Sequence, residues 1–217
     1  AYDRFVDVVP SPPMTRSAAP KNELRIIAGQ WRGRRIRFPA DTTIRPTPDR
    51  VRETLFNWLA PVIRGAHVAD LYAGSGALGL EALSRGAASA LFVETDARCA
   101  AALQAHCTTF GATQCEIVRG DALAVLRGAR APKRSPFDVV FVDPPFDAEL
   151  WSATAQALAH GGWLSPEAYI YLEMPVGHAL SGLPADWHPW REGKAGEVGY
   201  HLLRREPAPP ISDTTSA

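Results

Sequence analysis

The fold of this chain is decided by residues 68–79, VADLYAGSGALG, which place an apolar strand, a glycine-rich turn and a helix start in succession. Glycines lack side chains, so the backbone of such a turn can approach a ligand, and the N-terminus of the next helix favours anionic groups. A second apolar run over 90–94 ends in Glu94, 20 residues after Gly74, where a carboxylate can accept hydrogen bonds from both hydroxyls of a ribose. The stretch therefore predicts a nucleoside ligand at the edge of a β/α sheet.

Short apolar runs alternate with helical stretches from His67 onward. We expect strands over 68–72, 90–94, 115–119 and 137–143, and helices over 77–85, 96–110, 122–127 and 148–160. Strands that are apolar on both faces are typical of a parallel sheet with helices on both faces. Three further strands over 169–174, 187–191 and 198–204, the last two joined as an antiparallel hairpin, complete a mostly parallel seven-stranded sheet in an α/β domain.

Basic residues concentrate ahead of this domain, between Lys21 and Arg52, where nine of them accompany three acids. Alternation over 24–29 and 35–38 around a turn at 30–33 predicts a small basic β-hairpin. Thr47 followed by Pro48 predicts a helix N-cap with proline at the first helical position. We therefore expect a flexible leader (1–20), a hairpin extension (21–47), a main domain (48–205) and a flexible tail (206–217).

Composition excludes several classes of protein. Basic and acidic residues both number 23, so the formal net charge is zero and any nucleic-acid-binding face has to be local. No run reaches the roughly 18 apolar residues of a membrane span, and the N-terminus carries charges and prolines instead of an apolar signal core. The three cysteines and six histidines lack the spacing of a metal site, so we expect a cytoplasmic protein that uses no metal.

Two cofactors compete for the glycine turn. Gly74-x-Gly76-x-x-Gly79 matches the dinucleotide fingerprint, which favours a nicotinamide cofactor. Asp70 argues against it, because a carboxylate four residues ahead of Gly74 would repel a pyrophosphate. The zwitterionic amino-acid moiety on a sulfonium tolerates that acid better. A tight turn that binds nothing is the remaining alternative.

The sharpest signal is Asp143-Pro144-Pro145-Phe146, which follows an apolar run that we expect to lie beside the first strand. Two successive prolines stiffen the backbone and remove two N–H donors, which leaves the Asp143 carboxylate and the Pro144 carbonyl as acceptors. An exocyclic amino group carries two hydrogens and needs such acceptors, and Phe146 offers a face for stacking a planar base, worth roughly 1–3 kcal/mol. A turn with an exposed acid and a core phenylalanine is the alternative.

Together these motifs resemble class I S-adenosylmethionine-dependent methyltransferases that act on amino nitrogens. Residues 25–34 (RIIAGQWRGR), 45–59 (RPTPDRVRETLFNWL), 70–85 and 191–200 (REGKAGEVGY) look like the RsmD family of bacterial 16S rRNA guanine-N2 methyltransferases, and the similarity runs from about Leu24 to Arg205. The resemblance implies a Rossmann-like fold, S-adenosylmethionine as cofactor, and methylation of N2 of one guanine in 16S rRNA, within an assembling small ribosomal subunit. We expect the enzyme to be a monomer.

Expected roles for single residues follow from the motifs and the resemblance. Catalysis is expected to involve Asp143, Pro144 and Phe146. Expected cofactor contacts are Asp70, Tyr72, Gly74, Ser75, Gly76, Glu94, Thr95, Asp121, Ala122 and Thr47, of which Asp121 and Thr47 could equally be helix caps. Expected RNA contacts are Arg25, Trp31, Arg32, Arg34, Arg35, Arg37, Arg45 and Arg50; a solvated basic surface with Trp31 packed beneath it is the alternative. A DNA adenine or a protein glutamine stays open as the target, since Pro-Pro-aromatic loops present any amino or amide nitrogen.

Overall fold

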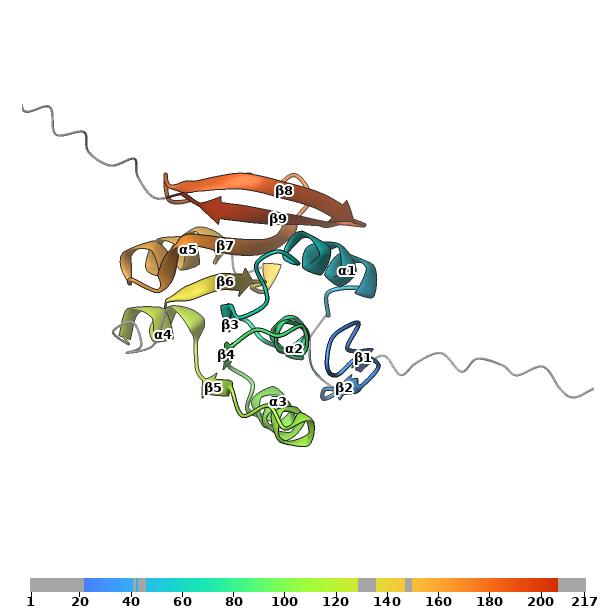
Figure 1. The fold of residues 1–217 in the computed structure, drawn as a ribbon. Coiled ribbons are helices and arrows are strands. Elements are labelled where there is room, and N and C mark those ends of the chain that lie inside the picture. Colours follow the sequence, from blue (N-terminus) through green and yellow to red (C-terminus); the bar gives the residue numbers. More distant parts are fainter. Residues whose placement is uncertain (1–21, 41, 43–45, 129–135, 147–149, 207–217) are drawn as a thin grey trace, which may run out of the picture.

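A computed structural model describes residues 22–40, 42, 46–128, 136–146 and 150–206, and it shows a seven-stranded sheet between layers of helices (Figure 1). The strand order is β5-β4-β3-β6-β7-β9-β8. The strands are β3 (His67–Asp70), β4 (Ser89–Glu94), β5 (Cys115–Arg119), β6 (Phe137–Val142), β7 (Leu164–Pro175), β8 (Trp187–Ala195) and β9 (Val198–Arg205). Neighbours from β5 to β7 pair in parallel, and β7–β9 and β8–β9 pair antiparallel. The predicted sheet with its C-terminal hairpin is confirmed.

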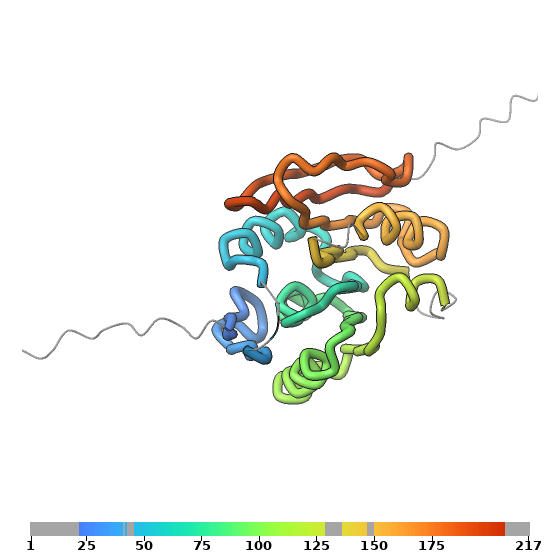
Figure 2. The backbone as a smooth tube through the Cα atoms, turned by 180° about the vertical axis from the view of Figure 1, so that it is seen from behind, coloured from blue at the N-terminus to red at the C-terminus, as the bar shows by residue number. Residues whose placement is uncertain are grey.

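Helices cover both faces of this sheet, as predicted. One face carries α1 (Asp49–Trp58), α2 (Ala77–Ser84) and α3 (Ala97–Phe110), and the other carries α4 (Ala122–Gly128) and α5 (Trp151–His160), as the two opposite views show (Figures 1 and 2). Each layer packs on its own apolar core. Within β6, Val139 and Phe141 face the first core while Val140 and Val142 face the second. The stretch of this central strand that is buried on both sides, 139–142, is apolar at every position, which is why its sequence shows no alternation.

Two strands are longer than predicted. β7 begins at Leu164 rather than at 169, because Leu164 pairs with Phe137 ahead of a register irregularity in β6. Pro166 and Glu167 inside that extension conceal the strand in the sequence. β8 continues to Ala195 at the edge of the sheet, and its register shifts next to Pro189, a position where proline is tolerated because an edge strand has one unpaired side.

The predicted helix cap at Thr47 is wrong. α1 begins at Asp49, Pro48 occupies the N-cap position, and no side chain caps the helix. The Thr47 hydroxyl instead donates a 2.6 Å hydrogen bond to the carboxylate of Glu173 on β7. A hydrogen bond to a buried carboxylate is stronger than a neutral cap, so tertiary structure overrides the local preference. The predicted leader, Arg45 and all but the first residue of the predicted tail lie outside the described residues.

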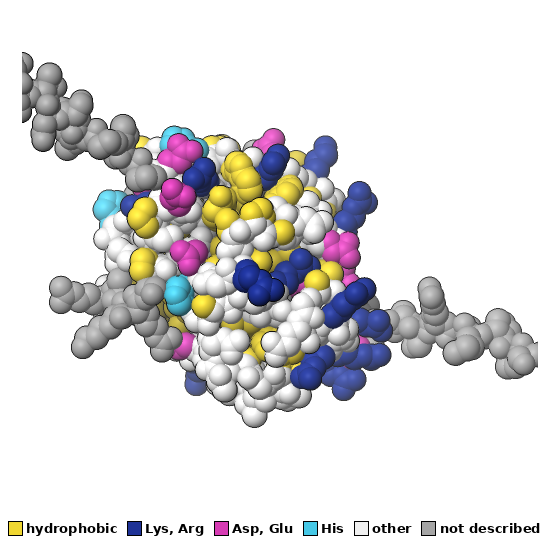
Figure 3. Space-filling view, in the orientation of Figure 1, with side chains coloured by type: hydrophobic (Ala, Val, Ile, Leu, Met, Phe, Trp, Pro, Cys, Tyr) yellow, Lys and Arg dark blue, Asp and Glu magenta, His cyan; other side chains and the backbone are white. Residues whose placement is uncertain are grey.

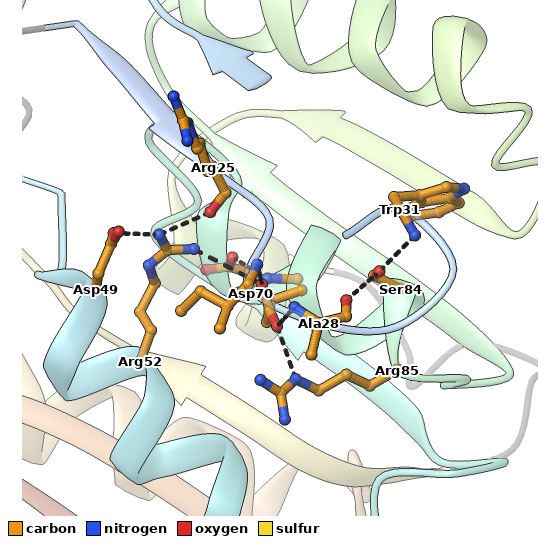
Figure 4. A network of polar contacts seen from close by, with 11 residues as sticks. Arg25, Ala28, Trp31, Asp49, Arg52, Asp70, Ser84 and Arg85 are labelled. Carbon is orange, nitrogen blue, oxygen red and sulfur yellow. Dashed lines mark hydrogen bonds and ion pairs between the residues drawn. The ribbon is translucent and has the colours of Figure 1, made fainter. Parts of the chain in front are cut away.

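The predicted basic hairpin is present as β1 (Glu23–Arg25) and β2 (Arg35–Arg37), with Leu24 paired to Ile36. Its connecting loop packs on α2 (Figure 4). The Ser84 hydroxyl donates to the Ala28 carbonyl at 2.6 Å and accepts from the Trp31 N–H at 2.9 Å. Gly29 has a φ of +82°, and a Cβ there would overlap the Ser84 carbonyl. This close approach of the two backbones therefore requires glycine.

A buried acid on α2 fixes the hairpin to the sheet domain. The Glu81 side chain is fully buried and accepts hydrogen bonds from the Ile27 and Ala28 N–H groups at 2.7 and 3.0 Å. The Arg85 guanidinium donates to it at 2.7 Å, and the buried Arg52 guanidinium lies 3.8 Å away. Arg52 also donates to the Arg25 carbonyl at 2.9 Å (Figure 4). One carboxylate thus joins α1, α2 and the hairpin.

We expect Glu81→Ala to lower the free energy of unfolding by about 3–5 kcal/mol, because it leaves two backbone N–H groups of the hairpin without their acceptor and leaves the buried Arg52 guanidinium with one acid, Asp49, instead of two. Urea unfolding followed by circular dichroism measures this change. Glu53→Ala, on the exposed side of α1, is the control and should shift the value by less than about 0.5 kcal/mol. Equal losses in the two variants would show that Glu81 does not anchor the hairpin.

Candidate active site

Three acidic side chains share one face of the sheet at the carboxyl edge of its parallel strands. Asp70 ends β3 and is paired with Phe141 of β6. Val142 of β6 pairs with Leu172 of β7, so the register continued by one residue sets Asp143 beside Glu173, on strands about 4.8 Å apart. Side chains alternate along a strand, and Phe141 and Tyr171 both lie in the core beneath α1 and α2. Asp70, Asp143 and Glu173 therefore point toward that same layer.

Asp70 is 3% exposed and accepts a hydrogen bond from the Gly79 N–H at 3.0 Å, in the first turn of α2. Burial raises the pKa of this carboxyl group to about 7, and the charges of Glu94 and Glu173 add to the rise against the effect of the Gly79 bond. The acid thus holds the start of the helix in place. It also carries a proton or a negative charge according to the pH near neutrality.

The glycine turn adopts the conformation that its sequence predicts. Gly74 and Gly76 have φ values of 51° and 74°, a left-handed region that other residues rarely occupy. The Glu94 carboxylate accepts from the Gly74 N–H at 2.6 Å and from the Asp96 N–H at 2.7 Å. A Cβ on Gly79 would overlap the Phe92 ring, so this third glycine serves the packing of α2 on β4. Glu94 and the turn therefore lie together at the carboxyl edge.

Asp143 is the acid at this edge without a protein donor. Its carboxylate accepts no hydrogen bond from any described residue, and burial together with the charges of Glu173 and Asp70 raises its pKa well above the usual value. The adjacent Pro144 is buried, and Phe146 is 37% exposed with its ring centroid 6.0 Å from that of Trp151. The signature thus offers an acid, a proline-stiffened backbone and a partly exposed ring, as expected.

Glu173 is the acidic residue that sequence reasoning missed. It is 4% exposed, and one of its oxygens accepts from the Thr47 hydroxyl at 2.6 Å and from the Tyr171 hydroxyl at 2.8 Å. Burial raises the pKa of this carboxyl group, although both hydrogen bonds oppose the rise. The available signal was a glutamate inside the apolar run YIYLEMP at 169–175, since a charged residue is rarely buried there without a role.

Several of the other expected cofactor contacts form hydrogen bonds within the protein. Asp121 accepts from the Ala124 N–H at 2.8 Å, as a helix cap does. The Tyr72 hydroxyl forms a 2.6 Å hydrogen bond with Thr154 on α5. Ser75 and Ala122 are buried, and Thr95 is exposed next to Glu94. Asp96 caps α3 and accepts from the Arg98 and Cys99 N–H groups.

The expected basic surface is present around the hairpin, where Figure 3 shows dark blue side chains gathered at the end occupied by β1 and β2. Its exposed members among the described residues are Arg25, Arg32, Arg34, Arg35, Arg37 and Arg50. Arg35 and Arg37 each contact Glu23 at 2.7 Å. Trp31 is 2% exposed and packs on Phe110. The ring belongs to the core, which agrees with the alternative that Trp31 packs beneath the basic surface.

Within the described residues, no helix has the length and apolar character needed to cross a membrane. No group of histidine, cysteine, aspartate or glutamate in those same ranges is arranged to hold a metal ion.

Comparison with known proteins places these features in a family. Residues 24–204 match the family model described as conserved hypothetical protein 95. The chain is 48% identical over 184 residues to ribosomal RNA small subunit methyltransferase D of Escherichia coli K12, covering 85% of this chain and 91% of the relative. The corresponding protein of Haemophilus influenzae is 42% identical over 187 residues, which is 85% of this chain and 95% of that one.

A solved structure agrees with this placement. The putative methyltransferase yhhF from Escherichia coli superposes with a TM-score of 0.77 at 48% identity, over 85% of this chain and 98% of the solved one. The glycine turn and the Asp-Pro-Pro-Phe signature lie inside the matched region of the family model, as does the N-terminal hairpin from Leu24 onward. The chain belongs to the RsmD family, that of ribosomal RNA small subunit methyltransferase D.

Proposed function

We propose that this protein transfers a methyl group from S-adenosylmethionine to the exocyclic N2 amine of a guanine in small-subunit rRNA, with Asp143 and Pro144 receiving that amine. The observation that carries the proposal is the Asp143 carboxylate, which has no donor among the described residues and stands one register position beyond β6, beside the acids of β3 and β7. The RsmD family to which the chain belongs supports the reaction class.

The residues at the carboxyl edge suit this cofactor. S-adenosylmethionine supplies a methyl group on a sulfonium when it is bound, and it also carries an ammonium and a carboxylate. Asp70, Asp143 and Glu173 offer negative charge, and no described lysine or arginine forms an ion pair with any of them. Glu94 at the end of β4 offers acceptors for a ribose. A positively charged nucleoside therefore meets acids with which no described lysine or arginine forms an ion pair.

Asp143 and Pro144 orient the attacking amine. The N2 lone pair of guanine is delocalised into the ring, so the amine reacts only if it is held toward the methyl carbon. The carboxylate and the Pro144 carbonyl accept its two hydrogens, and well-placed reactants gain roughly 7–11 kcal/mol from proximity and orientation. Phe146, which is partly exposed, stacks on the purine ring. An unpaired loop presents such a base at the lowest cost of unstacking.

Asp143 also stabilises the charge that develops. As the carbon–nitrogen bond forms and the sulfur–carbon bond breaks, with its electron pair left on sulfur, N2 becomes positively charged. A nearby carboxylate in a poorly solvated site stabilises that charge strongly. The proton then passes from N2 to the Asp143 carboxylate, whose raised pKa makes it a better acceptor than an ordinary aspartate.

The hairpin extension is the RNA-binding part of this proposal. Its exposed arginines and Arg50 carry positive charge beside the sheet domain, and phosphate contacts supply most of the affinity of proteins for nucleic acids. Arg45 belongs to the same stretch of sequence but lies outside the described residues. The substrate is small-subunit rRNA during ribosome assembly, which implies action in the cytoplasm, and the enzyme acts as a monomer.

We expect Asp143→Ala to lower methyl transfer to small-subunit rRNA by about 100-fold or more, because it removes the group that stabilises charge on N2. Affinity for S-adenosylhomocysteine should stay within a few fold. The measurement is tritium transfer from labelled cofactor, followed by digestion of the rRNA and identification of the methylated nucleoside.

Asp138→Asn is the matched control, since Asp138 lies near the opposite end of β6 and accepts from the His67 N–H. Full activity of the Asp143 variant would remove the proposed role for that residue. A methylated adenine in DNA or a methylated glutamine, in place of N2-methylguanine, would replace the proposed substrate.

The pH dependence of stability tests the burial of Asp70. Its pKa is about 7 in the folded protein against an ordinary value of 3.8 for aspartate, so the folded state binds this proton more tightly. The stabilisation is complete below pH 3.8 and disappears as the pH rises through 7. Between pH 5.5 and 8 the cofactor-free protein should lose about 2 kcal/mol from this group, roughly 4–8 °C in Tm. Asp70→Asn cannot titrate, so thermal unfolding should show a flatter profile for it; parallel profiles would contradict this account.

The arginine surface predicts a weaker salt dependence when it is neutralised. A variant combining Arg25→Ala, Arg32→Ala and Arg50→Ala should reduce the slope of log binding constant against log salt concentration by about 2, at roughly 0.7 per single-stranded phosphate contact. Filter binding of small-subunit rRNA over a salt series measures it, and cofactor affinity should not change. Arg127→Ala, exposed on α4 in the other layer, is the control. An unchanged slope would place the RNA elsewhere.

A further inference from the structure

Glu173 is connected to the chain around it by short hydrogen bonds to one oxygen. The Thr47 and Tyr171 hydroxyls both donate to Oε1, at 2.6 and 2.8 Å. Among the described residues no donor reaches Oε2. One side of this buried carboxylate is thus held by the segment that precedes α1 and by its own strand. The other side carries charge that the described protein leaves uncompensated.

The groups around Glu173 add negative charge and no positive charge. Asp143 follows β6, Asp70 ends β3, Tyr200 of β9 pairs with Glu173, and Tyr171 precedes it on β7. Burial raises the pKa of all three carboxyl groups, the charge of Glu173 adds to the rise at Asp70 and at Asp143, and the charge of Asp70 adds to the rise at Asp143. Thr47, ahead of α1, is uncharged. Three carboxyl groups on one face therefore favour a ligand with net positive charge.

The reaction proposed above changes the charge of the ligand at this face. The cofactor enters with a sulfonium, an ammonium and a carboxylate, which sum to a net charge of about +1. It leaves as a thioether that keeps the other two groups and has a net charge of about zero. Negatively charged carboxylates attract the sulfonium form of the cofactor and not the thioether product. The resulting difference in binding free energy is largest where water is scarce.

We propose that Glu173 is the residue by which this site prefers the sulfonium form of the cofactor to its thioether product, acting together with Asp143 and Asp70. The inference rests on the proposed function, and it extends that function to cofactor selection and product release. Glu173 is a positioning residue rather than a catalytic one, because it acts through its charge and through Thr47. Loss of the sulfonium charge on methyl transfer then weakens binding of the product and assists its departure.

The test compares two ligands on two isosteric variants. Calorimetry at pH 7.5 gives the Kd values of S-adenosylmethionine and S-adenosylhomocysteine for the full chain, for Glu173→Gln and for Glu167→Gln. Glutamine keeps an acceptor for Thr47 and Tyr171 but removes the charge. We expect Glu173→Gln to weaken S-adenosylmethionine binding about tenfold, which is about 1.4 kcal/mol, and S-adenosylhomocysteine binding less than twofold. Glu167 lies on the same strand, exposed and paired with Arg204, and its variant should leave both Kd values unchanged.

Each outcome decides the matter. Equal weakening of both ligands would show that Glu173 only holds the local structure, and no change in either would show that it has no part in binding. Either result overturns the inference while leaving the proposed function intact. A wild-type protein that binds neither ligand would remove the proposed function itself, and this inference with it.

A second measurement tests the inference if Glu173→Gln does not fold. For the wild-type protein, the ratio of the affinity for S-adenosylmethionine to that for S-adenosylhomocysteine should rise between pH 5.5 and 8.5. The pKa of Asp70, about 7, lies inside that range, and burial also raises the pKa values of Asp143 and Glu173, so loss of protons from this face favours the cation. A ratio that stays constant over this range would also overturn the inference.

Discussion

Burial of acids that have no cationic partner among the described residues is the constraint on which this site depends. Parallel strands end at one edge of a sheet, and the register of β3, β6 and β7 brings Asp70, Asp143 and Glu173 to the same face there. Removing a carboxylate from water without pairing it costs several kcal/mol. Asp70 limits that cost by holding its proton up to a pH of about 7. In the proposed function, a cation that enters the site compensates these charges instead.

The fully buried acid on α2 differs from these three acids, because the chain itself provides partners for its charge. Glu81 accepts two backbone N–H groups and faces the guanidinium groups of Arg52 and Arg85, so its charge is compensated within the chain. Its effect is structural, because it joins the hairpin extension to α1 and α2. The same chemical group therefore joins parts of the protein in one place, while in the other we propose that it binds a ligand. The difference lies in whether the chain itself supplies the donors and cations.

Much of the fold could be predicted because it is encoded locally. The strand over 115–119 and the placement of the Asp-Pro-Pro-Phe signature beside the first strand were predicted from apolar runs and turn residues, and the structure confirms both. The hairpin and the C-terminal antiparallel pair are confirmed in the same way. Residues whose neighbours are distant in sequence were not predictable. Trp31 was expected among the RNA contacts, but it is packed on Phe110 of α3, and nothing near it in the sequence indicates that contact.

The sequence by itself determined the fold class, the family and the identity of the signature residues, because periodicity, glycine turns and proline pairs act over a few neighbouring residues. Only the tertiary structure decided what Thr47 and Glu173 do. Their side chains are 126 positions apart and meet through one hydrogen bond, which a local pattern cannot specify. Register across the sheet then sets Glu173 beside Asp143. Strand pairing joins residues that are distant in sequence, and it brings Asp70, Asp143 and Glu173 to one face of the sheet.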